Sequence, residues 1–248
     1  MGEYRELEPA PALREHLSCL WYQSVAPDEA ARTQRVLPDA CIDIVWQAGE
    51  AAHIAGPDTG PVLAPMSPGT LVVGARFRPG HAPDFLGVAA HELRDAQPEL
   101  AALWGEASAR RLRESDATGS AEGMLDLLQG EVAARLGRVR DGDVPVAAMA
   151  WAQGRTGLDR LGADLHLGDR QLRRRVEERF GYGPAILRRV LRLQRLLALA
   201  ARHRGSLADL ALLAGYADQA HMTRESRRLT GLSPVRLLAE WLAGSPGQ

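Results

Sequence analysis

The spacing of apolar residues changes along the chain and divides it into a strand-rich part and a helical part. Short stretches rich in β-branched and aromatic residues predict strands over 19–25, 41–48 and 70–77. Within 41–48, isoleucines and a tryptophan alternate with other residues, as in a strand that buries one face. Glycines and prolines separate the strands, and the stretch 60–69 is predicted as a turn.

From residue 83 onward, apolar residues recur every three or four positions, which predicts helices over 83–95, 98–114 and 120–139. A polar segment over 138–145 that ends in Pro145 indicates a linker. Beyond it the pattern is helical throughout, with helices predicted near 144–153, 158–165, 169–180, 184–203, 207–214, 218–230 and 234–242.

The helical part contains an internal repeat with a period of fifty residues. An apolar residue, an arginine, a glycine and a proline recur in register: Leu172 and Met222, Arg174 and Arg224, Gly181 and Gly231, Pro184 and Pro234. Each copy reads as a short helix, a tight turn, a second helix and a glycine stop. This is the order of a helix-turn-helix unit, whose second helix enters the DNA major groove. The amphipathic helix between the copies would span ~30 Å, close to the ~34 Å between successive major grooves.

Charge is distributed unevenly. The net charge of −1 combines −8 over residues 1–142 with +7 over residues 143–248, and the chain has no lysine. An acidic half joined to a basic half favours two functions, with a polyanion bound by the basic half. We therefore expect an acidic domain over 1–142, with a sheet over about 19–80 and helices over about 83–138, followed by a basic all-α domain over 143–248.

Polar side chains share the outward face of the second helix in each copy. Arginine can bind guanine with two hydrogen bonds, glutamine can bind adenine, and threonine can bind either kind of base. An arginine-rich face on one helix is more often simply solvated, but two such faces in register favour DNA binding. The outward residues are Arg170, Arg173, Arg174 and Glu177 in the first copy and Ala220, Thr223, Arg224 and Arg227 in the second.

Residues 144–242 resemble the AraC-type (AraC/XylS) DNA-binding domain of bacterial transcription regulators. The resemblance rests on the signature LADLALLAGYADQAHMTRESRRLTGLSPVRLL and on the preceding linker helix RVLRLQRLLALA. It implies two helix-turn-helix units joined by a long helix. By position it implies that the reading residues are Arg170, Arg173 and Arg174, and Gln219, Ala220, His221, Thr223 and Arg224. We add Gln171 and Arg227 on the same helices as DNA-binding residues.

The chain departs from the family pattern in both units. His166 stands at the first turn glycine, Gly168 replaces the usual serine cap, and Val176 and Ser226 stand where the family has phenylalanine. We expect Ser226 to leave the second unit under-packed, so that Ser226→Phe would stabilise it. The alternative is that a neighbouring side chain already fills the space and that the added ring overpacks it.

The acidic half also carries a resemblance, over about residues 20–116. The stretches RVLPDACIDIVWQAG and VVGARFRPGHAPDFLGVAAHELRD are similar to the N-terminal domain of a group of actinobacterial AraC-type regulators. This implies a small β-barrel-like sheet with helices after it, serving as a sensor or dimerisation domain, and an α+β fold class for the chain. Because a barrel mouth is a common ligand site, the effector-binding candidates are Trp21, Asp43, Trp46, Arg76, Arg78 and His81. The plainer alternatives are core tryptophans and arginines that form ion pairs.

The sequence offers little support for catalysis. It contains no G-x-S-x-G, Walker or Gly-x-Gly-x-x-Gly motif, and its histidines lack the spacing of a barrel metal site. We expect no catalytic residue, no metal and no cofactor. Cys19 and Cys41 are expected to be reduced thiols of a cytoplasmic protein. Asp39 and Asp43 beside Cys41 should raise the pKa of its thiol and make it a poor sensor.

These observations predict a sequence-specific DNA-binding transcription regulator that is not an enzyme and is controlled by a small-molecule effector in its N-terminal domain. One alternative is a ligand-free regulator whose N-terminal domain only dimerises or binds a protein. Another is a barrel enzyme fused to a DNA-binding domain. The expected partner is double-stranded DNA, and a homodimer and contact with RNA polymerase are compatible with the resemblance. No apolar run reaches the ~18 residues of a membrane span, so no membrane partner is expected.

Overall fold

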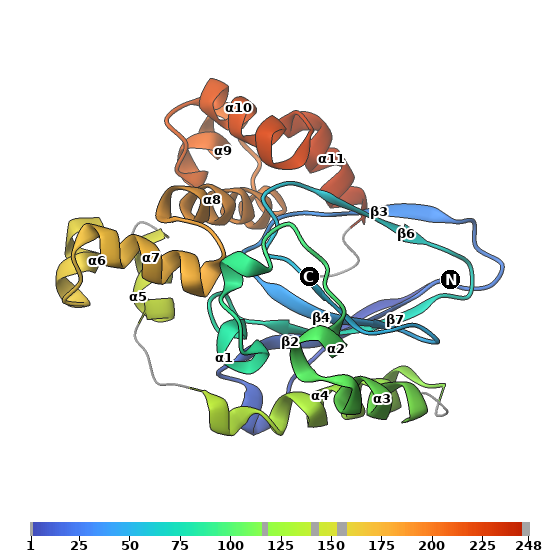
Figure 1. Ribbon diagram of the computed structural model, residues 1–248. Helices are drawn as coiled ribbons and strands as arrows, with labels where there is room; N and C mark the ends of the chain where they lie inside the picture. Colours follow the sequence, from blue (N-terminus) through green and yellow to red (C-terminus); the bar gives the residue numbers. More distant parts are fainter. Residues whose placement is uncertain (1, 116–118, 140–143, 153–157, 245–248) are drawn as a thin grey trace.

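The N-terminal half of the chain forms an open antiparallel sheet, as the computed structural model shows for residues 2–115, 119–139, 144–152 and 158–244 (Figure 1). The five strands of the sheet lie in the order β1 (Tyr4–Leu7), β2 (Leu17–Ser24), β7 (Leu71–Phe77), β4 (Ile42–Gln47) and β5 (His53–Ala55). Two further strands, β3 (Arg32–Val36) and β6 (Val62–Met66), pair only with each other. The expectation of an α+β fold with a small sheet is confirmed. Within the described residues, however, this ribbon does not join the sheet edges, so the sheet is not a closed barrel.

The three predicted strands are confirmed as β2, β4 and β7, the three central strands of the sheet. The prediction of a turn over 60–69 is wrong, because the stretch contains β6. Pro65 is accommodated there since a two-stranded ribbon leaves each strand with a free edge. The short or polar strands β1, β3 and β5 were not predicted, because they lack a clear apolar alternation.

The helices that follow the sheet are shorter than the apolar spacing suggested. The predicted 83–95 helix is α1 (Ala82–Leu86) and a 3-10 turn, η2 (Ala90–Glu92), because Gly87 ends α1 in the left-handed region, with φ 78°. The predicted 98–114 helix is likewise divided at Gly105, with φ 82°. The remaining elements of this half are η1 (Pro11–Leu13), α2 (Leu100–Trp104), α3 (Glu106–Ser115), α4 (Ala121–Ala133) and η4 (Leu136–Arg138).

The two faces of the sheet have different surroundings. The alternation in β4 places Ile44 and Trp46 in a buried core with residues of α1 and α4, and α4 runs along the lower face of the sheet in Figure 1. The opposite face carries a smaller apolar cluster, which includes Trp21 of β2 and Met66 of β6. The ribbon β3–β6 therefore contributes to covering the second face.

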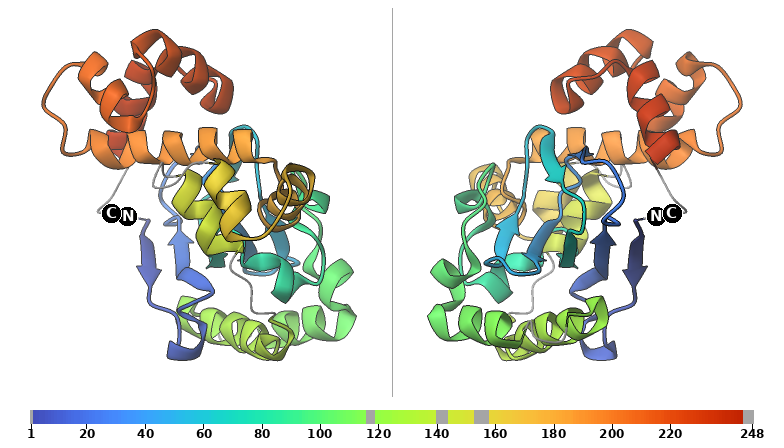
Figure 2. Two further views of the ribbon diagram at one scale, coloured as in Figure 1. Left: turned by 90° about the vertical axis from the view of Figure 1, so that its left-hand side faces the viewer. Right: turned by 90° about the vertical axis from the view of Figure 1, so that its right-hand side faces the viewer.

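The C-terminal half is helical, as predicted. Its helices are α5 (Val144–Ala152), α6 (Leu158–Asp164), α7 (Asp169–Phe180), α8 (Pro184–Ala200), α9 (Leu207–Ala214), α10 (Gln219–Thr230) and α11 (Pro234–Gly244). In both views of Figure 2, α8 lies between the group α9–α11 and the rest of the molecule. The predicted boundary at 142/143 lies outside the described residues.

The two halves share apolar contacts. Ala40, which precedes β4, belongs to the buried core of the C-terminal helices, and Leu37 packs against the same core. A side chain at Gly181, which follows α7, would collide with the Pro57 ring. The helical half is thus packed directly against the loops of the sheet half.

Candidate nucleic-acid interface

The first helix-turn-helix unit consists of α6 and α7. The chain turns between them at His166, whose φ of 52° is in the left-handed region, and the backbone N–H of Leu167 donates to the carbonyl of Gly162 at 2.9 Å. The N-cap of α7 is Gly168, whose backbone N–H donates to the side chain of Gln171 at 3.3 Å. Leu172 and two further apolar residues bury the inner face of α7.

The outer face of α7 carries the predicted DNA-binding residues of this unit. Arg170, Gln171, Arg173 and Arg174 are all exposed. The Nε atoms of Arg173 and Arg174 lie 3.6 Å from the carboxylates one turn further along, Glu177 and Glu178. Exposed pairs of this kind contribute little to stability, so both guanidinium groups can be redirected towards a phosphate or a base.

The second unit consists of α9 and α10 and has better-defined caps. Ser206 and Asp209 form the predicted capping box, with the Asp209 N–H donating to the Ser206 hydroxyl at 3.1 Å. Gly215 supplies the left-handed turn residue, with φ 90°. The carboxylate of Asp218 then accepts a hydrogen bond from the backbone N–H of His221 at 2.6 Å, which fixes the start of α10.

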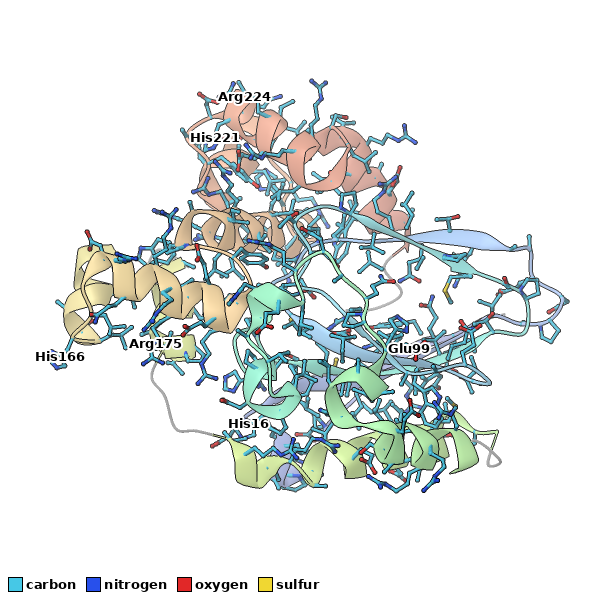
Figure 3. All side chains as sticks on the ribbon, viewed as in Figure 1. His16, Glu99, His166, Arg175, His221 and Arg224 are labelled. Atoms are coloured by element: carbon cyan, nitrogen blue, oxygen red, sulfur yellow. The ribbon has the colours of Figure 1, made fainter. Side chains whose placement is uncertain are left out.

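The outer face of α10 presents a mixed polar surface. Gln219, Ala220, Arg224 and Arg227 are exposed, whereas His221 and Thr223 are half-buried. The rings of His221 and Tyr216 meet edge-on, with 5.5 Å between their centroids. The Nδ1 atom of His221 accepts a hydrogen bond from the backbone N–H of Ala217. The hydroxyl of Thr223 donates to the carbonyl of Gln219 at 2.8 Å. Figure 3 shows Arg224 and His221 on α10 at the top of the molecule, and Arg175 and His166 on and beside α7 at the left.

The helix that joins the units is shorter than predicted. α8 has 17 residues, which corresponds to ~26 Å at ~1.5 Å per residue, instead of the ~30 Å expected from the sequence. Its buried face is formed by leucines, a valine and an alanine. This length is somewhat less than the ~34 Å of one DNA turn.

Comparisons with known proteins agree with this geometry. Residues 161–240, which span both units, match a family described as "Helix-turn-helix domain". The C-terminal region is an AraC-type helix-turn-helix domain. This match supports a DNA-binding role for the C-terminal region. Residues 5–99, ahead of the AraC-type domain, match a domain of unknown function, DUF6597.

The wider likeness of the chain is remote. Structures of ToxT from Vibrio cholerae align over most of both chains at low similarity. A structure bound to (E)-4-(8-methylnaphthalen-1-yl)but-3-enoic acid has 9% identity and a TM-score of 0.45, covering 97% of this chain and 98% of that one. A structure with bound unsaturated fatty acid has 9% identity and a TM-score of 0.43, covering 100% and 97%. A search of curated proteins finds no significant match.

The sheet half contacts both units of the AraC-type domain. Arg179 at the end of α7 forms an ion pair with Asp84 of α1, with 2.6 Å between Nη1 and Oδ2 and both side chains more than four-fifths buried. Arg35 of β3 donates to the carbonyl of Thr230 at the end of α10, and its Nε lies 3.5 Å from Glu240 of α11. Sequence reasoning missed these residues because their partners are between 95 and 205 positions away and no local pattern marks such contacts.

Three of the six effector-binding candidates lie together on the second face of the sheet. The register of β2, β7 and β4 brings Trp21, Arg76 and Asp43 side by side. The Trp21 indole donates to Asp43 at 3.0 Å, and the Arg76 Nε lies 3.2 Å from the same carboxylate. Burial raises the pKa of Asp43 to about 6, although Arg76 opposes the shift. The Asp43 carboxylate therefore serves as the hydrogen-bond acceptor for both Trp21 and Arg76.

The other three candidates lie elsewhere. Trp46 has no exposed surface in the helix-side core. Arg78 donates to the carbonyl of Arg14 at 2.9 Å. His81 lies 3.3 Å from His16, measured between their Nδ1 atoms, and burial, followed by the charge of His16, lowers the pKa of His81 to about 4. The structure does not assemble the six residues into one site, and their effector role stays a prediction.

The thiols have the expected environment. Burial raises the pKa of Cys41 well above its ordinary value, and the carboxylates of Asp39 and Asp43 add to the shift. Burial likewise raises the pKa of Cys19 to about 12. Both groups are therefore protonated and weakly nucleophilic at neutral pH. In the described part of the chain, no cluster of histidine, cysteine and carboxylate residues could hold a metal ion, and no helix could cross a membrane.

Proposed function

We propose that the chain is a sequence-specific transcription regulator that inserts α7 and α10 into successive major grooves of double-stranded DNA. The observation that supports it most directly is the pair of exposed polar faces, one on each second helix of the AraC-type domain, separated by α8. Arg174 and Arg224 occupy equivalent places in the repeat, and each can form two hydrogen bonds to a guanine. The other DNA-binding residues proposed above surround these two arginines.

The sheet half is proposed to act as the regulatory domain rather than as an enzyme. Its contacts with the ends of α7 and α10 support this role, because a change in the sheet half would alter how the two helices are held. A small-molecule effector is the proposed signal, and a ligand-free domain that only dimerises is the alternative. Such a regulator acts in the cytoplasm, where bacterial DNA is accessible.

The test is selection of DNA sequences from a random library by the full chain and by Arg174→Ala and Arg224→Ala variants. Each variant should lose ~1–3 kcal/mol of binding free energy and relax the preference at one base position, with the two positions about one helical turn apart. Arg113→Ala, at an exposed site on α3, is the matched control and should change neither. A uniform loss across all sequences would show that the two arginines contact phosphates only.

A further inference from the structure

Three arginines form a stripe along the outer side of α8, the helix that joins the two helix-turn-helix units. Arg188, Arg192 and Arg195 follow one another at intervals of four and three residues, which places them on one face of the helix. Arg188 and Arg195 are exposed, and Arg192 is half-buried. The buried face of α8, which includes Leu193 and Leu197, lies on the other side. These three residues are the arginine stripe.

The positive charge of the arginine stripe is not balanced by the carboxylates around it. Within the described residues, none of its three guanidinium groups has an ion-pair partner. Burial lowers the pKa of Arg192, and the charges of Arg188 and Arg189 lower it further. Glu225 of α10 attracts Arg192, but it already pairs with Arg189, whose Nε lies 3.2 Å from its carboxylate. Three arginines therefore surround one carboxylate here, and a net positive charge remains.

Two aromatic rings restrain the arginine stripe. The guanidinium of Arg188 lies over the Trp151 ring of α5, 5.8 Å from its centroid. That of Arg192 lies over the Tyr216 ring, 5.3 Å from its centroid. A cation–π contact restricts an arginine without using its hydrogen-bond donors, so both planar forks can still bind the oxygens of a phosphate.

The arginine stripe lies between the two helices proposed to read DNA. Tyr216 belongs to the turn before α10, and its ring meets the ring of His221 on α10 edge-on, so Arg192 lies beside the start of that helix. At its other end, α8 begins shortly after α7, and it runs between the group α9–α11 and the rest of the molecule (Figure 2). Between two successive major grooves on one side of DNA lies the minor groove, bordered by the phosphates of both strands.

We propose that the arginine stripe binds the phosphates that border this minor groove and so makes a third contact with DNA. The inference rests on the proposed function in one respect, that α7 and α10 occupy the flanking major grooves. Arg188 and Arg195 are seven residues apart, ~10.5 Å along the helix, which is enough to reach both sides of a minor groove ~6 Å wide. Contacts with phosphate fix the register of a protein on DNA and carry no sequence information. The stripe therefore supplies affinity, while the two helices read the bases.

The test measures the affinity of the full chain for two duplexes, one with the selected sequence and one with the same bases scrambled, from ~0.1 M to ~1 M salt. Arg188→Gln and Arg195→Gln should each make the slope of log affinity against log salt shallower by ~0.9, because each removes one phosphate contact. For each variant, the loss of affinity should be about eightfold greater at ~0.1 M salt than at ~1 M. The base preference in library selection should not change. Arg188→Lys and Arg195→Lys keep the charge and should retain the slope.

Arg94→Gln provides the matched control and should leave the slope unchanged. Arg94 is exposed in the sheet half and, like the arginine stripe, has no ion-pair partner within the described residues. An unchanged slope in both Gln variants would overturn the proposal, because the stripe would then be a solvated face only. A slope lost equally in the Lys variants would overturn it as well, since the arginines would then support the fold. So would a changed base preference, since they would then read a base.

The two duplexes separate this inference from the proposed function. If Arg174→Ala and Arg224→Ala left the base preference unchanged while the stripe variants still lost slope on both duplexes, the proposed function would be refuted and the stripe would stand as a phosphate-binding surface. If those two variants relaxed the base preference while the stripe variants kept the slope, the stripe alone would be refuted.

Discussion

At the scale of single residues, two departures from the family pattern have different structural outcomes. Ser226 is fully buried on α10, and its hydroxyl donates to the carbonyl of Leu232 at 2.9 Å. Thr230 in turn donates to the carbonyl of Ser226 at 2.7 Å. Because Ser226 is fully buried and its hydroxyl is hydrogen-bonded, the geometry favours the alternative in which an added ring overpacks the site. His166, by contrast, adopts a left-handed conformation that glycine adopts more readily.

We expect Ser226→Phe to destabilise the full chain by ~1–3 kcal/mol, because the ring must displace packed neighbours. The change also removes the Ser226 donor from the carbonyl of Leu232, which leaves only the longer contact from the Thr230 hydroxyl at 3.5 Å. Ser226→Ala, which removes only the hydrogen bond, should cost about 1 kcal/mol. Urea denaturation of the three proteins measures both effects. A higher denaturation midpoint for the Phe variant would show that the second unit is under-packed after all.

His166→Gly should stabilise the chain by about 1 kcal/mol, since a non-glycine residue in the left-handed region carries a cost of ~1–2 kcal/mol. The equivalent change in the opposite sense is Gly215→Ala, at φ 90° in the second unit, which should destabilise by a similar amount. The same denaturation measurement applies. If both variants lowered stability, the His166 side chain would have a stabilising role that outweighs its backbone conformation.

At the scale of elements, the two helix-turn-helix units differ in how firmly their second helices begin. α10 starts at Asp218, whose side chain accepts from the backbone of His221, whereas α7 starts at Gly168, which has no side chain to cap it. An N-cap side chain satisfies one of the backbone N–H groups that a helix start leaves unpaired. The first turn of α10 is therefore held in place before DNA binds, while that of α7 has only its backbone and Gln171.

Asp218→Ala should lower stability by ~0.5–2 kcal/mol, the usual cost of losing an N-cap. Because Gln219 and His221 belong to the same turn, DNA affinity should fall as well. Asp218→Asn keeps an oxygen acceptor and is the matched control, with most of both properties retained. Denaturation and DNA-binding titration measure the two quantities. Equal loss in the Ala and Asn variants would point to the charge of Asp218 rather than to its hydrogen bond.

The sequence was most informative where a pattern is local. The helices of the repeat and the strands β2, β4 and β7 follow from apolar spacing, and the capping box at Ser206 follows from its spacing to Asp209. The breaks at Gly87 and Gly105 were missed because an isolated glycine is also tolerated within helices. The cavity between the two halves could not be predicted at all, since its walls come from residues 59, 94, 95, 186, 189, 228 and 229, which only the tertiary fold brings together.

At the scale of the whole molecule, the junction between the halves concentrates negative charge. Burial raises the pKa of Asp58 to about 6, and the nearby carboxylates of Asp95, Asp39 and Asp43 add to the shift. The same region contains Tyr182, which is fully buried between α7 and α8 and whose hydroxyl has no hydrogen-bond partner in the described structure. Burial, then the surrounding carboxylates, raise the pKa of Tyr182. At neutral pH Asp58 is ionised although burial and the neighbouring carboxylates disfavour its charge. The ionised Asp58 therefore lowers the stability of the folded chain.

Asp58→Asn should therefore stabilise the chain at pH 7–8 by about 1–2 kcal/mol, with allowance for partial exposure of the carboxyl. Between the ordinary pKa of 3.8 and the folded value of about 6, the folded state binds more protons than the unfolded state. The contribution of Asp58 to stability consequently falls as pH rises through this window, and the advantage of the Asn variant should disappear near pH 4. Denaturation at both pH values measures this, with Asp126→Asn, exposed on α4, as the control. A pH-independent gain would show that ionisation of Asp58 is not the cause.

The direct packing of Ala40 and Leu37 into the helical core has a consequence for how the molecule unfolds. Neither half can separate without exposing apolar side chains of the other. Phe180 of α7 is one of the shielded side chains, because its ring lies beside Gly80 of the sheet half. Heating should therefore give a single cooperative transition in calorimetry, with the van't Hoff and calorimetric enthalpies equal. A DNA-binding fragment cut near residue 142 would expose the apolar surface that Ala40 and Leu37 cover in the full chain. Low solubility of such a fragment would therefore reflect the loss of the sheet half.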